Sequence, residues 1–227
     1  MKIAVLGTGV VGRALAGKLA SLGHETRMGT RDVEASLASD QATWDGTGTL
    51  AEWAAANQSV TLATFADAAD GAEVVVNATS GEGSLPALRA AGDLGGTVVM
   101  DISNPLDSSS GFPPQMFVCN DDSLAEQIQR ELPDARVVKT LNTVTAPVMV
   151  DPASVGGADH TVFVAGEDAD AKATVRGLLE SFGWRDVVDL GGIRAARGME
   201  MYITLWLGLM GGLGSPMFNV RVVRAEG

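Results

Sequence analysis

The chain has 227 residues, a length that fits one α/β domain with a small addition. Its 28 acidic and 16 basic residues give a net charge of −12, which argues against nucleic acid and anionic membrane as partners. The single cysteine, Cys119, excludes an internal disulfide and lies in an apolar run, so we expect a buried thiol in a protein of the reducing cytoplasm. Arg13 and Lys18 interrupt the apolar N-terminal run, so we do not interpret it as a secretory signal.

The first thirty residues predict a strand, a glycine turn, a helix and a second strand. Residues 2–6 are apolar and suit a strand that is buried on both faces. A glycine turn covers residues 7–12, and apolar positions at helical spacing follow until Gly23, which is placed to end the helix. Residues 24–29 then begin a second strand. This order is the context in which a glycine turn binds a dinucleotide.

Each glycine of the turn has its own expected role. Gly7 allows the tight turn after the strand, Gly9 lets a pyrophosphate approach the backbone, and Gly12 lets the helix pack closely against the strand. The N–H groups at the helix N-terminus attract the phosphates. The predicted cofactor-binding residues of this segment are Gly7, Thr8, Gly9, Val10, Val11 and Gly12. The alternative is a domain of the same fold that has lost its ligand.

The end of the second strand indicates which dinucleotide binds. An NAD site usually has an acidic residue here, which binds the ribose 2′-hydroxyl. Thr30 offers a hydroxyl and Arg31 a fixed positive charge, and both suit the 2′-phosphate of NADP, which Thr8 can also reach. Asp32 favours NAD if it points inward, and Arg31 can instead be a solvated arginine paired with an acid. The sequence favours NADP.

The remaining chain alternates strands and helices. Thr49 with Glu52 predicts a capping box, and Ser123 predicts a further helix N-cap. Strands are expected over residues 59–64, 72–78, 97–102, 136–139, 161–165 and 186–190, and helices over residues 33–39, 50–57, 65–69, 85–91, 124–132, 168–182 and 193–210. This pattern predicts an α/β fold, a doubly wound and mostly parallel Rossmann sheet with a small C-terminal α/β cap. We place the NADP-binding domain at residues 1–143 and the C-terminal domain, with its Met-rich helix, at residues 144–227.

Polar residues follow several predicted strands at the edge where ligands bind in such sheets. Ala78 and Thr79 follow the fourth strand and are expected near the nicotinamide; Ser103 follows the fifth strand. Asn142 follows the sixth and can bond a carboxamide or a ring carbonyl, or it is an ordinary turn asparagine. The polar loop at residues 107–114 is a candidate lid or inserted loop.

The glycine turn, the Thr30-Arg31 pair, the segment at residues 139–143 and the Met-rich final helix together resemble a known family. It is the family of NADP-dependent oxidoreductases that use the deazaflavin coenzyme F-420 (F420). The resemblance implies hydride transfer between NADP and the deazaflavin, with the deazaflavin stacked on the nicotinamide in a cleft between two domains. It also implies that Thr8, Thr30 and Arg31 hold the 2′-phosphate and that Ala78 lies over the nicotinamide. The chain departs from the family at Asn142, where some members have histidine, and at residues 32–35, where a further basic residue is common.

The residues themselves offer little acid–base chemistry. His24 and His160 lie at predicted strand starts, away from the ligand edge, and the sequence has neither a metal-binding cluster nor a nucleophile motif. Reduction of a carbonyl needs a placed proton donor, whereas hydride transfer between two ring cofactors needs stacking, distance and exclusion of water. The final helix is core, a homodimer interface or a cofactor wall.

Three functions remain open from the residues alone. The first is hydride transfer between NADP(H) and the deazaflavin. The second is NADPH-dependent reduction of an imine, ketone, flavin or metal complex, with Lys139 or Tyr202 as proton donor. The third is a non-catalytic NADP(H) redox sensor.

Overall fold

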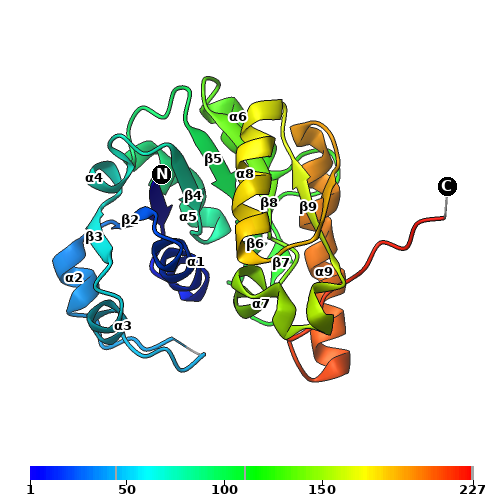
Figure 1. Cartoon of the computed structure of the whole chain (residues 1–227), viewed down its shortest axis with the longest axis horizontal. Helices are drawn as coiled ribbons and strands as arrows, with labels where there is room; N and C mark the ends of the chain where they lie inside the picture. Colours follow the sequence, from blue (N-terminus) through cyan, green and yellow to red (C-terminus); the bar gives the residue numbers. More distant parts are fainter. Residues whose placement is uncertain (44, 110, 226–227) are drawn as a thin grey trace.

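The computed structural model describes residues 1–43, 45–109 and 111–225, and its main feature is one eight-stranded sheet (Figure 1). The strand order is β10-β9-β8-β5-β4-β1-β2-β3, and every pairing is parallel except that of β8 with β9. The strands are β1 Lys2–Leu6, β2 Glu25–Thr30, β3 Val60–Thr64, β4 Val74–Asn77, β5 Val98–Asp101, β8 Arg136–Thr140, β9 Thr161–Ala165 and β10 Asp186–Asp189. The predicted α/β fold with a mostly parallel, doubly wound sheet is confirmed.

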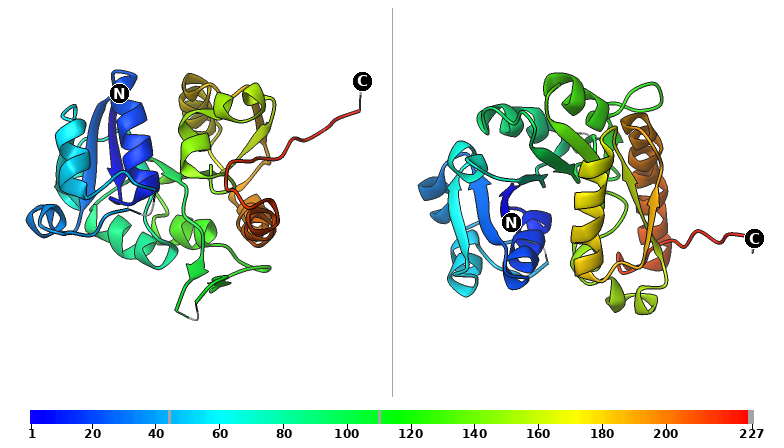
Figure 2. Two further views of the ribbon diagram at one scale, coloured as in Figure 1. Left: turned by 90° about the horizontal axis from the view of Figure 1, so that it is seen from below. Right: turned by 45° about the horizontal axis from the view of Figure 1, so that its top comes forward.

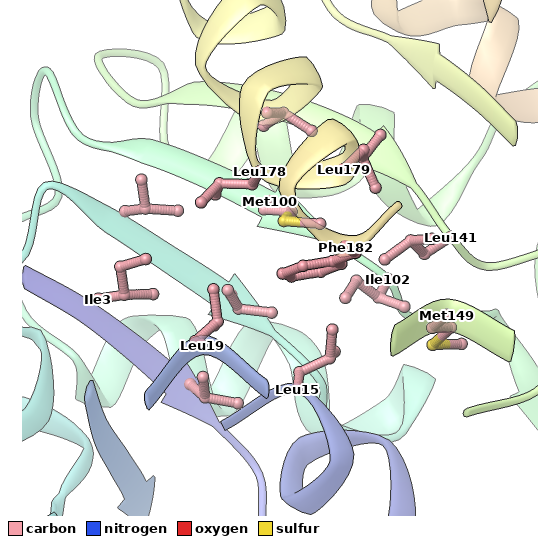
Figure 3. Close-up of a cluster of buried hydrophobic side chains, with 14 of the residues drawn as sticks. Ile3, Leu15, Leu19, Met100, Ile102, Leu141, Met149, Leu178, Leu179 and Phe182 are labelled. Carbon is pink, nitrogen blue, oxygen red and sulfur yellow. The ribbon is translucent and has the colours of Figure 1, made fainter. Parts of the chain in front are cut away.

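Helices cover both faces of the sheet. One face carries α1 Val10–Ser21, α3 Leu50–Ala56, α7 Ala146–Val150 and α8 Ala169–Phe182, and the other carries α4 Phe65–Ala69, α5 Gly81–Ala90, α6 Leu124–Glu131 and the start of α9 Ala196–Leu213. Helix α2, Val33–Leu37, follows β2. Figure 3 shows Leu15 and Leu19 of α1 opposite Phe182 of α8 in the first core cluster. The strands are therefore buried on both sides.

Strand β1 shows why a continuous apolar run was the right signal for a central strand. Ile3 and Val5 join the cluster beneath α1, whereas Ala4 and Leu6 join the cluster on the opposite face. Successive side chains of a strand point to opposite faces, so a strand covered by helices on both sides can be apolar at consecutive positions.

The local signals for helix ends are confirmed at several positions. Thr49 and Glu52 form the capping box of α3, and Ser123 accepts a hydrogen bond from the Glu126 N–H at the start of α6. Gly23 follows α1 with φ of 86°. Helix α5 begins earlier than predicted, at Gly81, and it contains Pro86.

The C-terminal part of the chain extends the same sheet. Strand β9 pairs antiparallel with β8, and β10 pairs parallel with β9. Two short 3₁₀ turns, η1 Pro152–Ser154 and η2 Gly156–Ala158, precede β9, and η3 Ile193–Ala195 leads into α9. After α9 the chain runs along the start of β9, where the Thr161 N–H donates to the Val220 carbonyl, and then leaves the body (Figures 1 and 2).

Two predictions about single side chains were wrong. Cys119 is exposed, because its apolar run lies in the chain after the short hairpin of β6 Leu106–Asp107 and β7 Gln115–Met116 rather than in the core. His160 lies at the edge where the parallel strands end, because β9 runs antiparallel to β8. The segment predicted as a lid or inserted loop, residues 107–114, begins at the end of β6 and leads to β7; Ser110 within it lies outside the described residues.

The described helices include none that is both long and apolar enough to cross a membrane. Within the same residues there is no group of three His, Cys, Asp or Glu side chains placed to hold a metal ion.

Candidate functional site

A cavity of about 1030 Å³ opens at the carboxyl ends of the central strands. It lies where the strand order reverses between β1 and β4, the position at which doubly wound sheets bind ligands. The cavity extends from the end of β2, across the glycine turn, to the segments after β5 and β8 and to α9. Its lining residues are Thr8, Gly9, Val10, Val11, Arg13, Thr30, Arg31, Asp32, Ala35, Ser36, Ser39, Gln41, Ala42, Thr43, Leu50, Ala78, Thr79, Ser80, Ile102, Asn104, Asn142, Val144, Thr145, Ala146, Met149, Ile203 and Trp206.

The three glycines of the turn have different surroundings. Gly7 has φ of +113°, and a Cβ there would lie 2.6 Å from the Ala78 carbonyl oxygen. A Cβ at Gly12 would lie 2.0 Å from the Gly7 carbonyl oxygen, so α1 packs directly on the turn. A Cβ at Gly9 would meet no protein atom within 4 Å, and Gly9 lines the cavity. The space beside Gly9 fits a phosphate that approaches the backbone.

The end of β2 forms a polar pocket. The Thr30 hydroxyl lies 2.7 Å from the Ser36 hydroxyl, and both residues line the cavity next to Arg31. Asp32 also lines the cavity, but its Oδ1 accepts a hydrogen bond of 2.9 Å from the Ala35 N–H as the N-cap of α2. This bond occupies one oxygen of the carboxylate that would favour NAD.

Arg13 also lines the cavity, although no motif in the sequence marks it as a site residue. Its Nε donates to the Thr8 carbonyl and its guanidinium donates to the Gly48 carbonyl, each at 2.8 Å. Burial lowers the pKa of the guanidinium, although the nearby Asp45 carboxylate opposes this. Arg13 therefore ties the glycine turn to the loop before α3 and adds a positive charge beside the turn.

The predicted residues after β4 and β5 are only partly brought together. Ala78 and Thr79 line the cavity, whereas Ser103 does not. Ser103 is buried, and its hydroxyl donates to Asp101 Oδ1 at 2.7 Å. Its neighbours Ile102 and Asn104 line the cavity in its place.

Asn142 is buried at the cavity wall with one free hydrogen-bonding group. Its Nδ2 donates to Asn104 Oδ1 and to the Met199 carbonyl, both at 2.9 Å. A carbonyl only accepts, so this contact fixes the orientation of the amide. Its Oδ1 is buried and has no hydrogen-bond partner among the described residues. Asn142 therefore offers an acceptor, which suits the NH₂ group of a carboxamide but not a ring carbonyl.

Helix α9 forms the wall at the opposite end from β2. Ile203 and Trp206 of α9 line the cavity, and the indole of Trp206 stacks on Phe218 with ring centroids 5.4 Å apart. The indole Nε1 is buried and, within the described part of the chain, lacks an acceptor. A buried donor without a partner is costly, so a ligand that accepts from Nε1 would stabilise this wall.

The proton donors considered from the sequence do not line the cavity. Lys139 is fully buried, and its Nζ lies 2.8 Å from Asp101 Oδ2 and 2.9 Å from Glu200 Oε1. Tyr202 is half-buried and burial raises the pKa of its phenol, but it too lies outside the lining. The two histidines also lie elsewhere. Among the described lining residues the ionisable ones are Arg13, Arg31 and Asp32, toward the β2 end.

Comparison with known proteins agrees with this geometry. The sequence model of the family described as "NADP oxidoreductase coenzyme F420-dependent" matches residues 2–105. The F420-dependent NADP reductase of Methanothermobacter marburgensis is 31% identical over 92% of this chain and 92% of its own length. The chain belongs to this family. It is an NADP oxidoreductase of the F420-dependent group.

Two further relatives of this family match almost the whole chain. The F420-dependent NADP reductase of Methanothermobacter thermautotrophicus is 30% identical over 92% of this chain and 89% of its own length. A crystal structure from Arthrobacter sp. FB24, described provisionally as an F420-dependent NADP reductase, is 54% identical with a TM-score of 0.94 and covers 99% of this chain and 100% of that one. The similarity therefore includes the C-terminal part that carries α9.

Proposed function

We propose that this chain transfers a hydride between NADP(H) and the deazaflavin coenzyme F420 within the cavity described above. The observation that supports this proposal most strongly is the chemical difference between the two ends of that cavity. Its β2 end holds the charged and hydroxyl side chains that suit the phosphates of NADP. Its α9 end combines apolar side chains with two buried polar atoms that have no hydrogen-bond partner among the described residues. The family relationship supports the pairing of these two substrates.

The residues present fit NADP. The open space beside Gly9 admits the pyrophosphate, and the N-terminus of α1 faces it. Thr8, Thr30 and Arg31 would hold the 2′-phosphate, since two hydroxyls and a guanidinium can all donate to it. We infer a preference for NADP over NAD, because Asp32 caps α2 through one of its oxygens.

At the other end, the residues position the rings and exclude water. Asn142 Oδ1 would accept from the carboxamide of the nicotinamide, and Trp206 Nε1 would donate to an oxygen of the second ring. Ile102, Met149 and Ile203 supply apolar walls. When bound, the two coenzymes supply the hydride donor and acceptor carbons. The scarcity of acids and bases at this end suits such a transfer, which needs distance and alignment.

Absorbance spectroscopy tests the proposal directly. NADPH is mixed with oxidised F420 and the purified protein, and the bands of both coenzymes are followed. We expect them to fall together in equal amounts, and to recover when NADP is added to the reduced deazaflavin. NADPH binding without exchange would contradict the proposal and would favour the sensor. Turnover of an imine or ketone in place of F420 would favour the second alternative.

We also propose a homodimer that forms through α9 and the segment after it. Several apolar side chains of this region are exposed: Met201, Leu205, Leu213, Met217 and Val223. Exposed apolar patches commonly mark interfaces between proteins. Light scattering after gel filtration should give twice the mass of one chain for the unchanged protein. The double variant Leu205→Lys, Leu213→Lys should give the mass of one chain. A single mass for the unchanged protein at all concentrations would contradict the dimer.

We propose two functional parts and a cytoplasmic location. Residues 1–143 would bind NADP, and residues 144–227 would supply the α9 wall for the second substrate. The exposed thiol of Cys119 fits a reducing compartment. Cell fractionation with antibody detection tests the location, and recovery of the protein outside the cytoplasmic fraction would contradict it.

A further inference from the structure

A row of polar side chains crosses the sheet beneath the cavity. Asn77, Asp101 and Lys139 are neighbours in register on β4, β5 and β8, and all three are fully buried. Each follows a pair of apolar residues in its strand, and each lies on the sheet face that packs against α5, α6 and α9. The row therefore lies between the cavity wall formed by the residues after β4 and the opposite wall formed by α9.

Hydrogen bonds connect the row from one wall to the other. Asn77 Nδ2 donates to Asp101 Oδ1 at 2.8 Å, and Lys139 Nζ donates to Asp101 Oδ2 at 2.8 Å. Lys139 Nζ lies 2.9 Å from Glu200 Oε1 of α9. At the other end, the Thr79 hydroxyl donates to Asn77 Oδ1 at 2.7 Å. We call Asn77, Asp101, Lys139 and Glu200 the buried polar chain.

Both ends of the buried polar chain reach residues that line the cavity. Thr79 lines it directly after β4. Glu200 lies three and six positions before Ile203 and Trp206, which are the lining residues of α9. The Glu200 carboxylate also accepts from the N–H groups of Leu124 and Ala125 at 2.8 and 3.0 Å, which fixes it to the N-terminus of α6.

Stability alone does not account for such a group. Burying three charged side chains carries a large desolvation cost, and apolar side chains of similar size often serve stability equally well. A fully satisfied buried network instead specifies one arrangement of the elements that it joins. Here those elements carry the two walls between which the coenzyme rings would meet.

We propose that the buried polar chain is a set of positioning residues, which fixes the separation between the Thr79 wall and the α9 wall of the cavity. None of its members lines the cavity, so they act through Thr79 and through α9. The kinetic consequence rests on the proposed function, because hydride transfer depends steeply on the separation and alignment of the reacting atoms. The structural coupling of the two walls does not depend on it.

Amide hydrogen exchange measures that coupling without any turnover. The variants are Asn77→Leu at one end and Glu200→Gln at the other. We expect Asn77→Leu to speed exchange in residues 199–206 of α9, and Glu200→Gln to speed exchange in residues 78–80. Changes confined to the element that carries each substitution would overturn the proposal.

Thr140→Val is the matched control. Thr140 is also buried on β8, and its hydroxyl donates to the Phe163 carbonyl at 2.8 Å, outside the buried polar chain. We expect it to leave exchange at both walls unchanged. Equal effects from this control would show that the buried polar chain contributes only to general stability, and this would overturn the proposal.

Single-turnover hydride transfer gives the second measurement. Asn77→Leu and Glu200→Gln should each slow the transfer by about tenfold at saturating coenzymes, because a small displacement of reacting groups has such effects. The double variant should be less than additive, since both substitutions break the same coupling. Rates within twofold of the unchanged protein, in folded variants, would overturn the kinetic part.

The remaining outcomes are also decisive. If the unchanged protein transfers no hydride, the proposed function fails, and hydrogen exchange alone decides the coupling. If Asn77→Leu or Glu200→Gln does not fold, Thr79→Val is used, because it removes the terminal link without leaving a buried charge. It should speed exchange in α9, and Thr79→Ser, which keeps the hydroxyl, should not. No difference between these two variants would overturn the proposal.

Discussion

The two ends of the cavity differ in how the chain builds them. The β2 end comes from residues close together in sequence: the turn at residues 7–12, the pair Thr30-Arg31 and helix α2. The α9 end comes from side chains far apart in sequence, such as Ile102, Asn142 and Trp206. The first end is charged and hydroxyl-rich, and the second is apolar with polar atoms that lack partners within the described part of the chain. A local segment can thus encode a phosphate site, whereas a ring site needs the finished fold.

The glycine turn allows the largest test of this difference. Gly12→Ala should lower the free energy of unfolding by about 1–3 kcal/mol, because its Cβ would meet the Gly7 carbonyl at 2.0 Å. Gly9→Ala should leave the unfolding temperature unchanged, since its Cβ meets no protein atom within 4 Å. It should instead weaken NADPH binding by about tenfold, because the Cβ occupies the space of the pyrophosphate.

Calorimetry checks both halves of this prediction. Thermal unfolding gives the stability of each variant, and titration with NADPH gives its affinity. Equal loss of stability in both variants would show that the turn is structural only, and full NADPH affinity in Gly9→Ala would place the pyrophosphate elsewhere.

The positive charge of Arg31 at the β2 end leads to the next-largest expected effect, which is on NADPH affinity. Arg31→Ala should weaken NADPH binding by roughly 10–100-fold, since hydrogen bonds to charged groups are worth about 1.5–3 kcal/mol. NADH binding should stay the same, because NADH lacks the 2′-phosphate. Arg89→Ala, which removes an arginine paired with Glu131 away from the cavity, is the control. Equal losses for NADPH and NADH would assign Arg31 a role other than 2′-phosphate recognition.

A substitution at the α9 end should have a smaller effect on substrate binding. Unlike Gly12→Ala, it should not lower the stability of the free protein. Trp206→Phe keeps an aromatic side chain, though a smaller one, and removes the buried Nε1 donor, which has no acceptor among the described residues. The free protein should not become less stable, because an unpaired buried donor is removed. The Michaelis constant for F420 should rise by about threefold to tenfold, the worth of one neutral hydrogen bond.

Steady-state kinetics with varied F420 and varied NADPH separates the two substrates. The Michaelis constant for NADPH should not change. Trp53→Phe, a matched change on α3 outside the cavity, should change neither constant. A rise for NADPH alone would move Trp206 from the second substrate to the first.

The local end was predictable because its signals are short. A glycine turn between a strand and a helix, and a capping box at Thr49 and Glu52, depend on residues that are near neighbours in the chain. The direction of β9 was not predictable in this way, because a buried strand has the same apolar pattern whether it runs parallel or antiparallel. That direction placed His160 at the opposite edge from the one expected.

The distant end depends on contacts that no spacing reveals. Lys139 reads as a candidate proton donor, but its partners Asp101 and Glu200 come from other elements and remove it from the cavity. The one available signal was the polar residue that directly follows the apolar run of each of three strands, as in Val74-Val75-Val76-Asn77. Such residues in adjacent strands share a face, so they can be expected to bond one another.

A partly buried ion pair at the start of α9 gives the smallest predicted effect. Arg197 of α9 donates two hydrogen bonds to Glu126 of α6, at 2.7 and 2.8 Å, and these bonds hold the pKa of the Glu126 carboxyl below its ordinary value of 4.5. The carboxylate therefore adds stability above pH 4.5, and this contribution is lost as the pH falls through the lowered pKa.

Glu126→Gln should lower the unfolding temperature slightly at pH 7 and not in acid below that pKa. Thermal unfolding of both proteins across this range measures the difference, which solvent keeps small because Arg197 is partly exposed. A difference that persists unchanged in acid would show that shape rather than charge joins α6 to α9 at this point. Hydride transfer at pH 7 should be unaffected, because Glu200 and Asn142 still hold α9 at the cavity.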